Sequence, residues 1–209
     1  MREEGERPSI ALLACGALAI ETAQIARNRG WDADLHGISS FHHMDPPKIV
    51  VDVDRKLAEL TQRYDRVVVV YGDCGTGGAL DKVIAKYPAA RPAGVHCYQW
   101  FLEEDAQDIV DNRTGTYYFT DWLVRNWERA VIRGLGLDRF PWLKDTYFGS
   151  LTDVLYLRQD PDPALEEKAR EIAAYMGLPI EIRDTGLSPL ERQLVPLMEE
   201  MDVHTGRST

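Results

Sequence analysis

The sequence contains few cysteines, and it lacks a long apolar run. Its 209 residues include 3 cysteines, an odd number that is too small for a disulfide framework. A chain of this length buries a large core without such bonds, so we expect reduced thiols. No run of about 20 apolar residues exists, which argues against a membrane-spanning helix. The charged start is followed only by the short apolar run 10–20, so no signal peptide is predicted, and we expect a cytoplasmic protein.

Basic residues are in the minority. The chain has 24 Lys and Arg against 34 Asp and Glu, which gives a net charge of -10. Nucleic acids and anionic membranes are bound by clustered Lys and Arg, so neither is an expected partner. A small-molecule substrate or a protein partner fits this charge better.

Two common nucleotide-binding patterns are also missing. The glycine cluster at 75–78 does not have the spacing GxxxxGK[ST], and the turn at Cys15-Gly16 lacks the spacing GxGxxG. The cluster nevertheless precedes a predicted helix, whose first N–H groups can bind an anion. Gly75, Gly77 and Gly78 are therefore candidate cofactor-binding residues.

Stretches that suit strands alternate with stretches that suit helices along the chain. Strands are predicted at 9–14, 31–38, 67–70, 93–95, 116–120, 154–157 and 179–182, and helices at 17–29, 48–64, 79–86, 98–112, 122–134, 163–176 and 189–201. The second strand alternates apolar and polar residues as an edge strand does. Asp121 is placed to cap the helix 122–134. This order predicts an α/β fold with a mainly parallel, doubly wound sheet and helices on both faces. Residues 1–209 are expected to form a single domain, with a division into two α/β halves near 112–115 as the alternative.

The most informative stretch is 66–78, where four valines end in a turn that carries Asp73 and Cys74. Consecutive β-branched residues are typical of a strand that is buried on both faces. In a parallel sheet the carboxyl end of such a strand faces the ligand crevice. Cys15 follows the first predicted strand and Cys97 follows the fourth, so we expect all three thiols at one edge of the sheet.

The loop 39–47 follows the second strand and would bring a histidine to the same edge. His43 is the first candidate, and His42 and His96 are alternatives. Three thiolates and one imidazole are the ligand set of a closed tetrahedral zinc site, so Cys15, His43, Cys74 and Cys97 are candidate metal ligands. The closely spaced cysteine pairs that usually mark structural zinc are absent, so this prediction depends on topology. The competing interpretation is that the cysteines are small buried apolar residues.

Two further residues stand directly before a cysteine. Asp73 precedes Cys74 and His96 precedes Cys97, so each is a candidate catalytic residue that transfers a proton or orients a ligand. A helix cap is the simpler interpretation of Asp73, and a hydrogen-bonded histidine at a strand end is the simpler interpretation of His96.

Several short motifs occur together. They are Ala-Cys-Gly-Ala-Leu at 14–18, His43 with Pro46 and Lys48-Ile49, Tyr-Gly-Asp-Cys-Gly-Thr-Gly-Gly at 71–78, Gly-Val-His-Cys-Tyr at 94–98, Gly-Thr-Tyr-Tyr-Phe-Thr-Asp at 115–121 and Ile-Arg-Gly-Leu-Gly-Leu-Asp at 132–138. In this combination the chain resembles the Domain of Unknown Function 1638 family over most of its length. The family has no established activity. Its members are typically encoded in bacteria and archaea beside corrinoid-dependent methyltransferases, corrinoid proteins and folate-linked one-carbon enzymes. The loop Met44-Asp45-Pro46-Pro47 departs from the family pattern, which leaves the choice between His42 and His43 open.

The residues and the resemblance together suggest three functions. The first is a zinc-thiolate protein of corrinoid- and folate-linked one-carbon metabolism, in which a methyl group passes to a thiol. The second is an iron–sulfur protein in which the same cysteines hold a cluster that reduces a corrinoid. The third is a non-catalytic accessory module that binds a corrinoid protein or a methyltransferase. Whether the protein is an enzyme is left open by the sequence.

Overall fold

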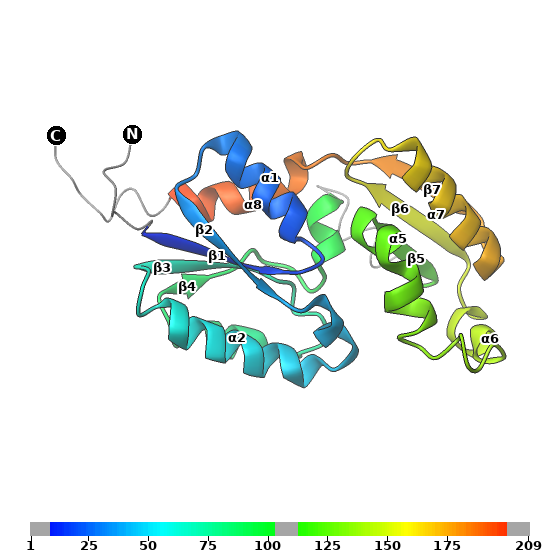
Figure 1. Ribbon diagram of the computed structural model, residues 1–209, viewed down its shortest axis with the longest axis horizontal. Coiled ribbons are helices and arrows are strands. Elements are labelled where there is room, and N and C mark those ends of the chain that lie inside the picture. Colours follow the sequence, from blue (N-terminus) through cyan, green and yellow to red (C-terminus); the bar gives the residue numbers. More distant parts are fainter. Residues whose placement is uncertain (1–8, 103–112, 200–209) are drawn as a thin grey trace. The chain divides into compact units, whose positions relative to one another are not determined.

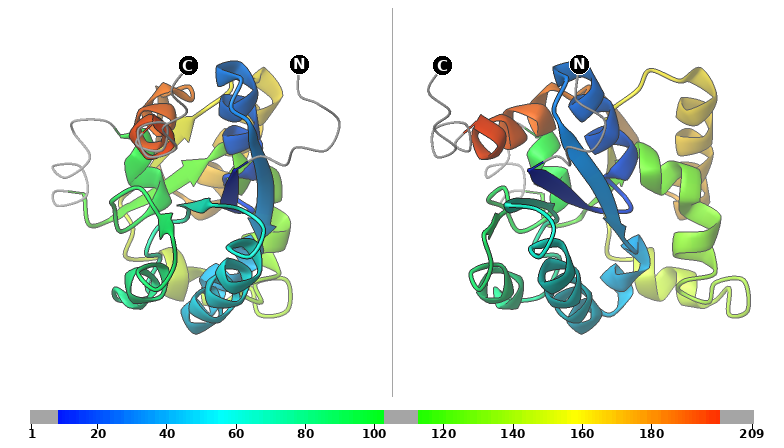
Figure 2. Two further views of the ribbon diagram at one scale, coloured as in Figure 1. Left: turned by 90° about the vertical axis from the view of Figure 1, so that its left-hand side faces the viewer. Right: turned by 60° about the vertical axis from the view of Figure 1, so that its left-hand side comes forward.

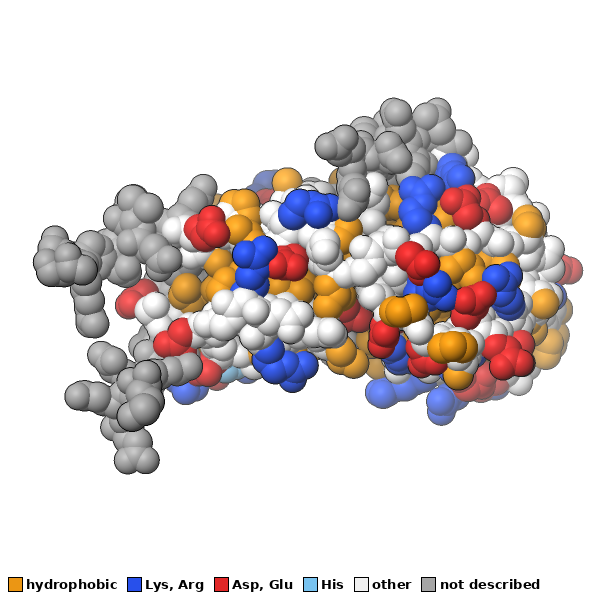
Figure 3. Space-filling model, turned by 90° about the horizontal axis from the view of Figure 1, so that it is seen from above, with side chains coloured by type: hydrophobic (Ala, Val, Ile, Leu, Met, Phe, Trp, Pro, Cys, Tyr) orange, Lys and Arg blue, Asp and Glu red, His pale blue; other side chains and the backbone are white. Residues whose placement is uncertain are grey.

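The computed structural model describes residues 9–102 and 113–199, and it confirms the α/β fold class (Figure 1). All strand pairs that it contains are parallel, but they form two sheets, one of four strands and one of three. No helix in this part of the chain is both long and apolar enough to cross a membrane. On the face shown in Figure 3, acidic and basic side chains are interspersed rather than gathered by sign.

The chain folds into two compact units. They divide between Cys97 and Tyr98 and again between Pro189 and Leu190, so the last helix returns to the first unit. The division that the sequence suggested near 112–115 starts outside the described residues, and the boundary found here lies earlier. That the whole chain acts as one domain stays a prediction.

The first unit is built on the four-stranded sheet, whose order is β2-β1-β3-β4. The strands are β1 (Ile10–Cys15), β2 (Ala33–Ile38), β3 (Arg66–Val70) and β4 (Ala89–Ala90). β1 and β3 are the inner strands, and their valine, leucine and alanine side chains are fully buried. β2 lies at an edge, as its alternating pattern indicated. β4 lies earlier than the strand expected at 93–95, which leaves residues 91–96 as a long loop after it.

Helices cover both faces of this sheet. α1 (Ala19–Arg29) and α8 (Ser188–Glu199) lie on one face, and α2 (Pro46–Leu60) lies on the other with α3 (Ala79–Ile84) beside it (Figure 2). α2 buries one stripe of residues at helical spacing, which are Ile49, Val53, Leu57 and Leu60. It starts at Pro46 rather than at Lys48, because proline fits the first turn of a helix, where no N–H is needed. A short 3-10 helix, η1 (Ser40–Met44), comes directly before it.

The second unit contains the parallel sheet β5-β6-β7. Its elements are β5 (Thr116–Thr120), α5 (Asp121–Trp127), the π-helical turn η4 (Glu128–Ile132), α6 (Leu143–Phe148), β6 (Asp153–Arg158), α7 (Pro163–Met176) and β7 (Ile180–Asp184). Aromatic residues Phe119, Trp127, Phe148 and Tyr156 form the centre of its core. The 3-10 helix η2 (Cys97–Phe101) spans the junction with the first unit, and most of the helix expected at 98–112 lies outside the described residues.

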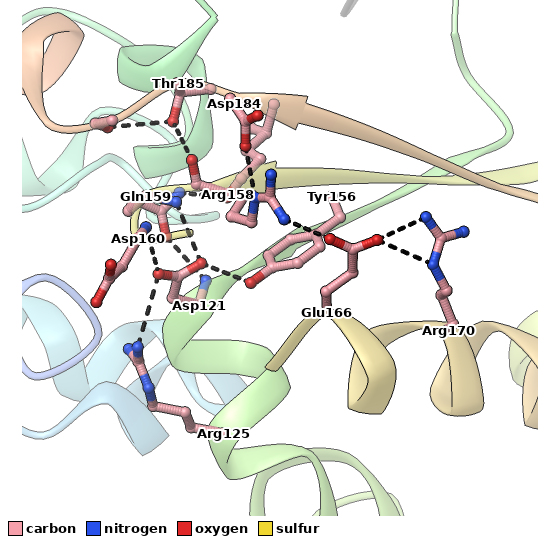
Figure 4. A network of polar contacts seen from close by, with 12 residues as sticks. Asp121, Arg125, Tyr156, Arg158, Gln159, Asp160, Glu166, Arg170, Asp184 and Thr185 are labelled. Carbon is pink, nitrogen blue, oxygen red and sulfur yellow. Dashed lines mark hydrogen bonds and ion pairs between the residues drawn. The ribbon is translucent and has the colours of Figure 1, made fainter. Parts of the chain in front are cut away.

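Asp121 ties the ends of β5 and β6 together and does not cap α5 (Figure 4). The Thr120 side chain is the cap, since it accepts a hydrogen bond from the Leu123 N–H. The Asp121 carboxylate is only 1% exposed and accepts from the Tyr156 hydroxyl at 2.7 Å and from the N–H groups of Gln159 and Asp160 at 3.2 and 2.9 Å. Burial raises its pKa, while these donors favour the charged form. Asp121 therefore holds the second sheet together at its carboxyl edge.

Candidate functional site

The carboxyl edge of the first sheet is where the candidate residues meet. The chain leaves β1 toward β2 on one side of the sheet, and it leaves the neighbouring strand β3 toward β4 on the other side. Connections that leave adjacent strands in opposite directions open a crevice between them, and ligands of α/β proteins bind there. Cys15 is the last residue of β1, and Cys74 follows β3, so both cysteines stand at this crevice.

Backbone contacts join the four loops of this edge. The Gly16 N–H donates to the Ile38 carbonyl at 2.8 Å, which links the loops after β1 and β2. The Cys74 N–H donates to the Val95 carbonyl at 2.9 Å, which links the loops after β3 and β4. A Cβ atom added to Gly75 would lie 3.4 Å from Cγ of Pro46, so the loop after β3 also touches the start of α2. The expectation that the loops after parallel strands meet at one edge of the sheet is therefore correct for these loops.

Gly72 allows the loop that carries Cys97 to approach Cys74. An added Cβ at this position would lie 2.9 Å from the Cys97 backbone nitrogen and 3.2 Å from Sγ of Cys74. These two atoms leave no room for a side chain at residue 72. Cys74 and Cys97 consequently lie next to each other, on either side of Gly72.

Cys74 has an unusual backbone conformation. Its φ of +47° makes it the only non-glycine residue with a positive φ in the described part of the chain. A side chain in the left-handed region costs about 1–2 kcal/mol, because Cβ crowds the following carbonyl. Strain of this kind persists where the surroundings enforce it, and it is common at functional positions. Cys74 also sits on a strand-to-turn-to-helix connection, as the nucleophile of a nucleophile elbow does.

The Cys74 side chain is arranged to be a thiolate. It is 6% exposed. A hydrogen bond from the Cys97 thiol is the largest influence on its pKa; burial opposes this, and the His43 ring adds a further hydrogen bond and a favourable charge. The result is a Cys74 pKa of about 5. The same contacts raise the pKa of Cys97 well above its ordinary value and raise the pKa of His43. At neutral pH, Cys74 is thus the charged partner and Cys97 the neutral donor.

Cys15 and Tyr71 form the inner wall of the edge. Burial raises the pKa of the Cys15 thiol to about 11, so it stays neutral. The Tyr71 ring is 1% exposed, and its hydroxyl lies beside Cys15 without a partner of ordinary hydrogen-bond geometry among the described residues. Burial also raises the pKa of Tyr71, and the three cysteines raise it further. The three thiols are therefore not equivalent, because only Cys74 is charged.

The two adjacent histidines of the second loop have different contacts. His42 Nε2 lies 2.5 Å from a carboxylate oxygen of Asp52 on α2, and Arg55 contacts the other oxygen of that carboxylate. His43, which is exposed, interacts with Cys74. His43 is thus the histidine that the loop brings to the thiolate. His96 is half-buried in the loop that carries Cys97, and its role in proton transfer stays a prediction.

Asp73 is bonded within its own loop. Its carboxylate accepts hydrogen bonds from the Thr76 hydroxyl and from the N–H groups of Gly77 and Gly78, the latter two at 2.9 Å. Although burial opposes it, these donors hold the pKa of Asp73 below its ordinary value. The N–H groups of Gly77 and Gly78 are therefore already engaged by this carboxylate. Gly75, Gly77 and Gly78 have φ values of 86°, 61° and 81°, which the turn requires, and their role in cofactor binding stays a prediction.

The residues at this edge suit a soft metal ion in kind. Thiolates and imidazole are preferred ligands of zinc. Their positions are less suitable, because no group of three or more His, Cys, Asp or Glu residues among 9–102 and 113–199 is arranged to hold a metal ion. Cys97 and His43 both interact with Cys74, while Cys15 lies beside Tyr71. The metal role of these residues stays a prediction.

Tyr71 and Gly72 lie in the motif at 71–78, but they were not predicted as site residues. Both follow directly after the valine strand, at the point where its buried pattern ends. A large polar residue at the end of a fully buried strand, followed by glycine, is the signal that could have identified them.

Comparison with known proteins adds a family and no activity. A search of curated proteins finds no match to this chain. The family described as "Protein of unknown function (DUF1638)" matches residues 38–194, a range that contains His43, Cys74 and Cys97 but starts after Cys15. Because this match covers most of the sequence, the chain belongs to the DUF1638 family of proteins of unknown function.

Proposed function

We propose that Cys74 is the reactive thiolate of a protein that serves methyl transfer to sulfur in corrinoid- and folate-linked one-carbon metabolism. The observation that carries the proposal is that the buried Cys74, in a left-handed conformation in the loop after β3, has the Cys97 loop packed against its sulfur, with His43 and Cys97 lowering its pKa. These partners favour the thiolate, the form in which sulfur binds soft metals and attacks carbon. The metabolic setting, a cytoplasmic location, a small-molecule substrate and a corrinoid protein or methyltransferase as partner follow from the family resemblance and from the composition.

The first form of this proposal is a zinc-thiolate site. Cys74 would be the central ligand, and Cys15, His43 and Cys97 would complete the set. Bound zinc would supply a Lewis acid that keeps a substrate thiol in its thiolate form. The chain itself contributes a preformed thiolate, two neutral thiols and an imidazole on loops that backbone hydrogen bonds hold together.

Metal and sulfide analysis of protein purified anaerobically without chelators tests this form. We expect about one zinc ion per chain and no sulfide, and we expect Cys74→Ser to lose the metal. Cys15→Ser should weaken zinc binding as well, because Cys15 would be a ligand. Metal-free wild-type protein would exclude the zinc-thiolate form.

The second form is direct attack by Cys74 on a methyl group. The left-handed backbone of Cys74 favours it, because such a turn presents a nucleophile at a strand end. The thiolate lone pair would form the sulfur–carbon bond while the bond to the leaving group breaks, and that bond's electron pair would stay on the leaving group. With a methylcorrinoid as donor, the leaving group is cobalt in its Co(I) state.

Methylcobalamin is the probe for the second form. Anaerobic incubation should add one methyl group to the Cys74 peptide and produce the absorbance of cob(I)alamin in equal amount. Cys15→Ser should react as the wild type does, and Cys74→Ser should not react. An unmodified Cys74 peptide after prolonged incubation would refute direct attack by Cys74 on a methylcorrinoid.

The iron–sulfur and accessory-module alternatives are addressed by related measurements. Acid-labile sulfide together with iron in the anaerobic preparation would favour the cluster. Capture of a corrinoid protein that is equally strong for wild type and Cys74→Ser would favour the accessory module.

A further inference from the structure

We propose that Cys74 and Cys97 form a reversible disulfide in response to a hydroperoxide, with Cys74 as the attacking sulfur and Cys97 as the resolving thiol. This inference rests on the proposed function only in using the Cys74 sulfur as a nucleophile. It adds a two-electron redox reaction and a means of regulation to the same site.

The proximity of Cys97 to the Cys74 sulfur is the first argument. A Cβ atom added to Gly72 would lie 3.2 Å from Sγ of Cys74 and 2.9 Å from the Cys97 backbone nitrogen, so Cys97 lies next to the Cys74 sulfur. Cys15, by contrast, lies beside the Tyr71 hydroxyl. Of the three thiols, Cys97 is thus the one placed to react with an oxidised Cys74.

The backbone around the pair is the second argument. A disulfide requires Cα atoms within about 7 Å of each other. The Cys74 N–H is bonded to the Val95 carbonyl at 2.9 Å, two residues before Cys97. Because Gly72 has no side chain, the Cys97 backbone nitrogen and Sγ of Cys74 both lie close to the place that its Cβ would occupy. The two loops are already held together, so the bond would form by rotation of the side chains.

Exposure selects the class of oxidant. Cys74 is 6% exposed, and Cys97 is half-buried. A hydroperoxide as small as hydrogen peroxide can reach a sulfur at this depth. The susceptibility of a cysteine to peroxide follows its thiolate character and its exposure.

The reaction proceeds in two balanced steps. The Cys74 thiolate attacks one peroxide oxygen, the oxygen–oxygen bond breaks, and hydroxide leaves, so Cys74 becomes a sulfenic acid. The Cys97 sulfur then attacks the Cys74 sulfur, the sulfur–oxygen bond breaks, and the hydroxyl leaves as water with the Cys97 proton. The two cysteines lose two electrons, and the peroxide gains them.

The disulfide is expected to be easily reduced. Its formation removes the Cys74 thiolate, and with it the hydrogen bonds from Cys97 and His43 that stabilise the reduced form. Stabilisation of the reduced form makes a disulfide more oxidising. The bond would thus block the thiolate under oxidative conditions and release it when reductant returns.

Mass spectrometry of the full chain after hydrogen peroxide treatment tests the inference. The three cysteines fall in three tryptic peptides, which end at Arg27, Lys82 and Arg113, so each possible pairing gives a distinct product. We expect two of the three thiols to disappear, a linked pair of the Lys82 and Arg113 peptides, and full recovery of thiols with dithiothreitol.

Two variants complete the experiment. Cys15→Ser should form the same disulfide as the wild type. Cys97→Ser should accumulate a sulfenic acid at Cys74 that dimedone traps, with no intramolecular disulfide. Circular dichroism establishes that both variants fold.

Three results would overturn the inference, and they are distinct from failure of the proposed function. They are the survival of all three thiols, a disulfide that includes Cys15, and overoxidation of Cys74 while Cys97 stays a free thiol. The alkylation rate of Cys74 at acidic pH is measured on the same protein. Rapid alkylation without a disulfide would reject this inference and leave the thiolate proposal intact.

Discussion

Lowering the pH from about 7 to about 5.5 should leave the alkylation rate of Cys74 almost unchanged. With a pKa of about 5, Cys74 is almost entirely thiolate at pH 7 and remains mostly thiolate at pH 5.5. The thiolate fraction then falls by less than about 1.5-fold, whereas for an ordinary thiol with a pKa of about 8.5 it falls roughly 30-fold. Because only the thiolate reacts, the rate should follow this fraction.

The assay is pulsed labelling with iodoacetamide, followed by quantification of the modified Cys74 peptide. Urea-unfolded protein gives the reference rate for ordinary thiols. Cys15 and Cys97, whose pKa values are both raised, should react far more slowly than Cys74 in the folded protein. A roughly 30-fold loss of the Cys74 rate between these pH values would refute the thiolate assignment.

Variants of the two hydrogen-bond donors extend this measurement. The hydrogen bond from Cys97 lowers the Cys74 pKa the most, and His43 lowers it by less. Cys97→Ala and His43→Ala should therefore both raise the Cys74 pKa, the former by more, each by about one pKa unit or more. A profile that is unchanged in both variants would show that neither residue stabilises the charge. His42→Ala is the matched control, because His42 pairs with Asp52 instead.

Three further outcomes follow from individual contacts. Gly72→Ala should lower the free energy of unfolding in urea by about 1–3 kcal/mol, because its Cβ would lie 2.9 Å from a backbone nitrogen, while Gly37→Ala, which meets open space, should change it by less than about 1 kcal/mol. Asp73→Ala should cost about 1–3 kcal/mol at neutral pH. Since the pKa of folded Asp73 is lowered, its contribution is present above the unfolded pKa and is lost as the pH falls through the folded value, so wild type and variant should converge in acid. Tyr156→Phe should cost about 1.5–3 kcal/mol, because it removes the hydroxyl that donates to the buried Asp121 carboxylate. Equal urea midpoints for any of these variants and the wild type would contradict the corresponding contact.

Much of the fold could be predicted because strands and helices carry distinct local patterns. The valines of β3 and the helical stripe of α2 identify themselves by periodicity. The division of the strands into two sheets could not be predicted, because strand adjacency is set by long-range packing that alternation does not encode. The position of β4 was missed for a related reason: its two alanines have little strand preference.

The candidate site was predictable to the level of loops and not of atoms. Residues that follow parallel strands lie at one edge of the sheet, so the positions of Cys15, Cys74 and Cys97 could be predicted without side-chain detail. The choice of His43 over His42 depends on Asp52, which lies ten residues away on α2 and competes for one of the two rings. The inequality of the thiols depends on burial and hydrogen bonding, which spacing along the chain does not reveal.

The loop after β3 carries an internal anion. A phosphate-binding turn is ordered by the ligand that it captures, but here the Asp73 carboxylate already occupies the N–H groups of Gly77 and Gly78. Because this anion is covalently attached, its local concentration does not depend on any solute. The turn that supports Cys74 is thus folded before a reaction partner arrives. A partner that binds at the sulfur therefore does not have to supply the hydrogen bonds that order this loop.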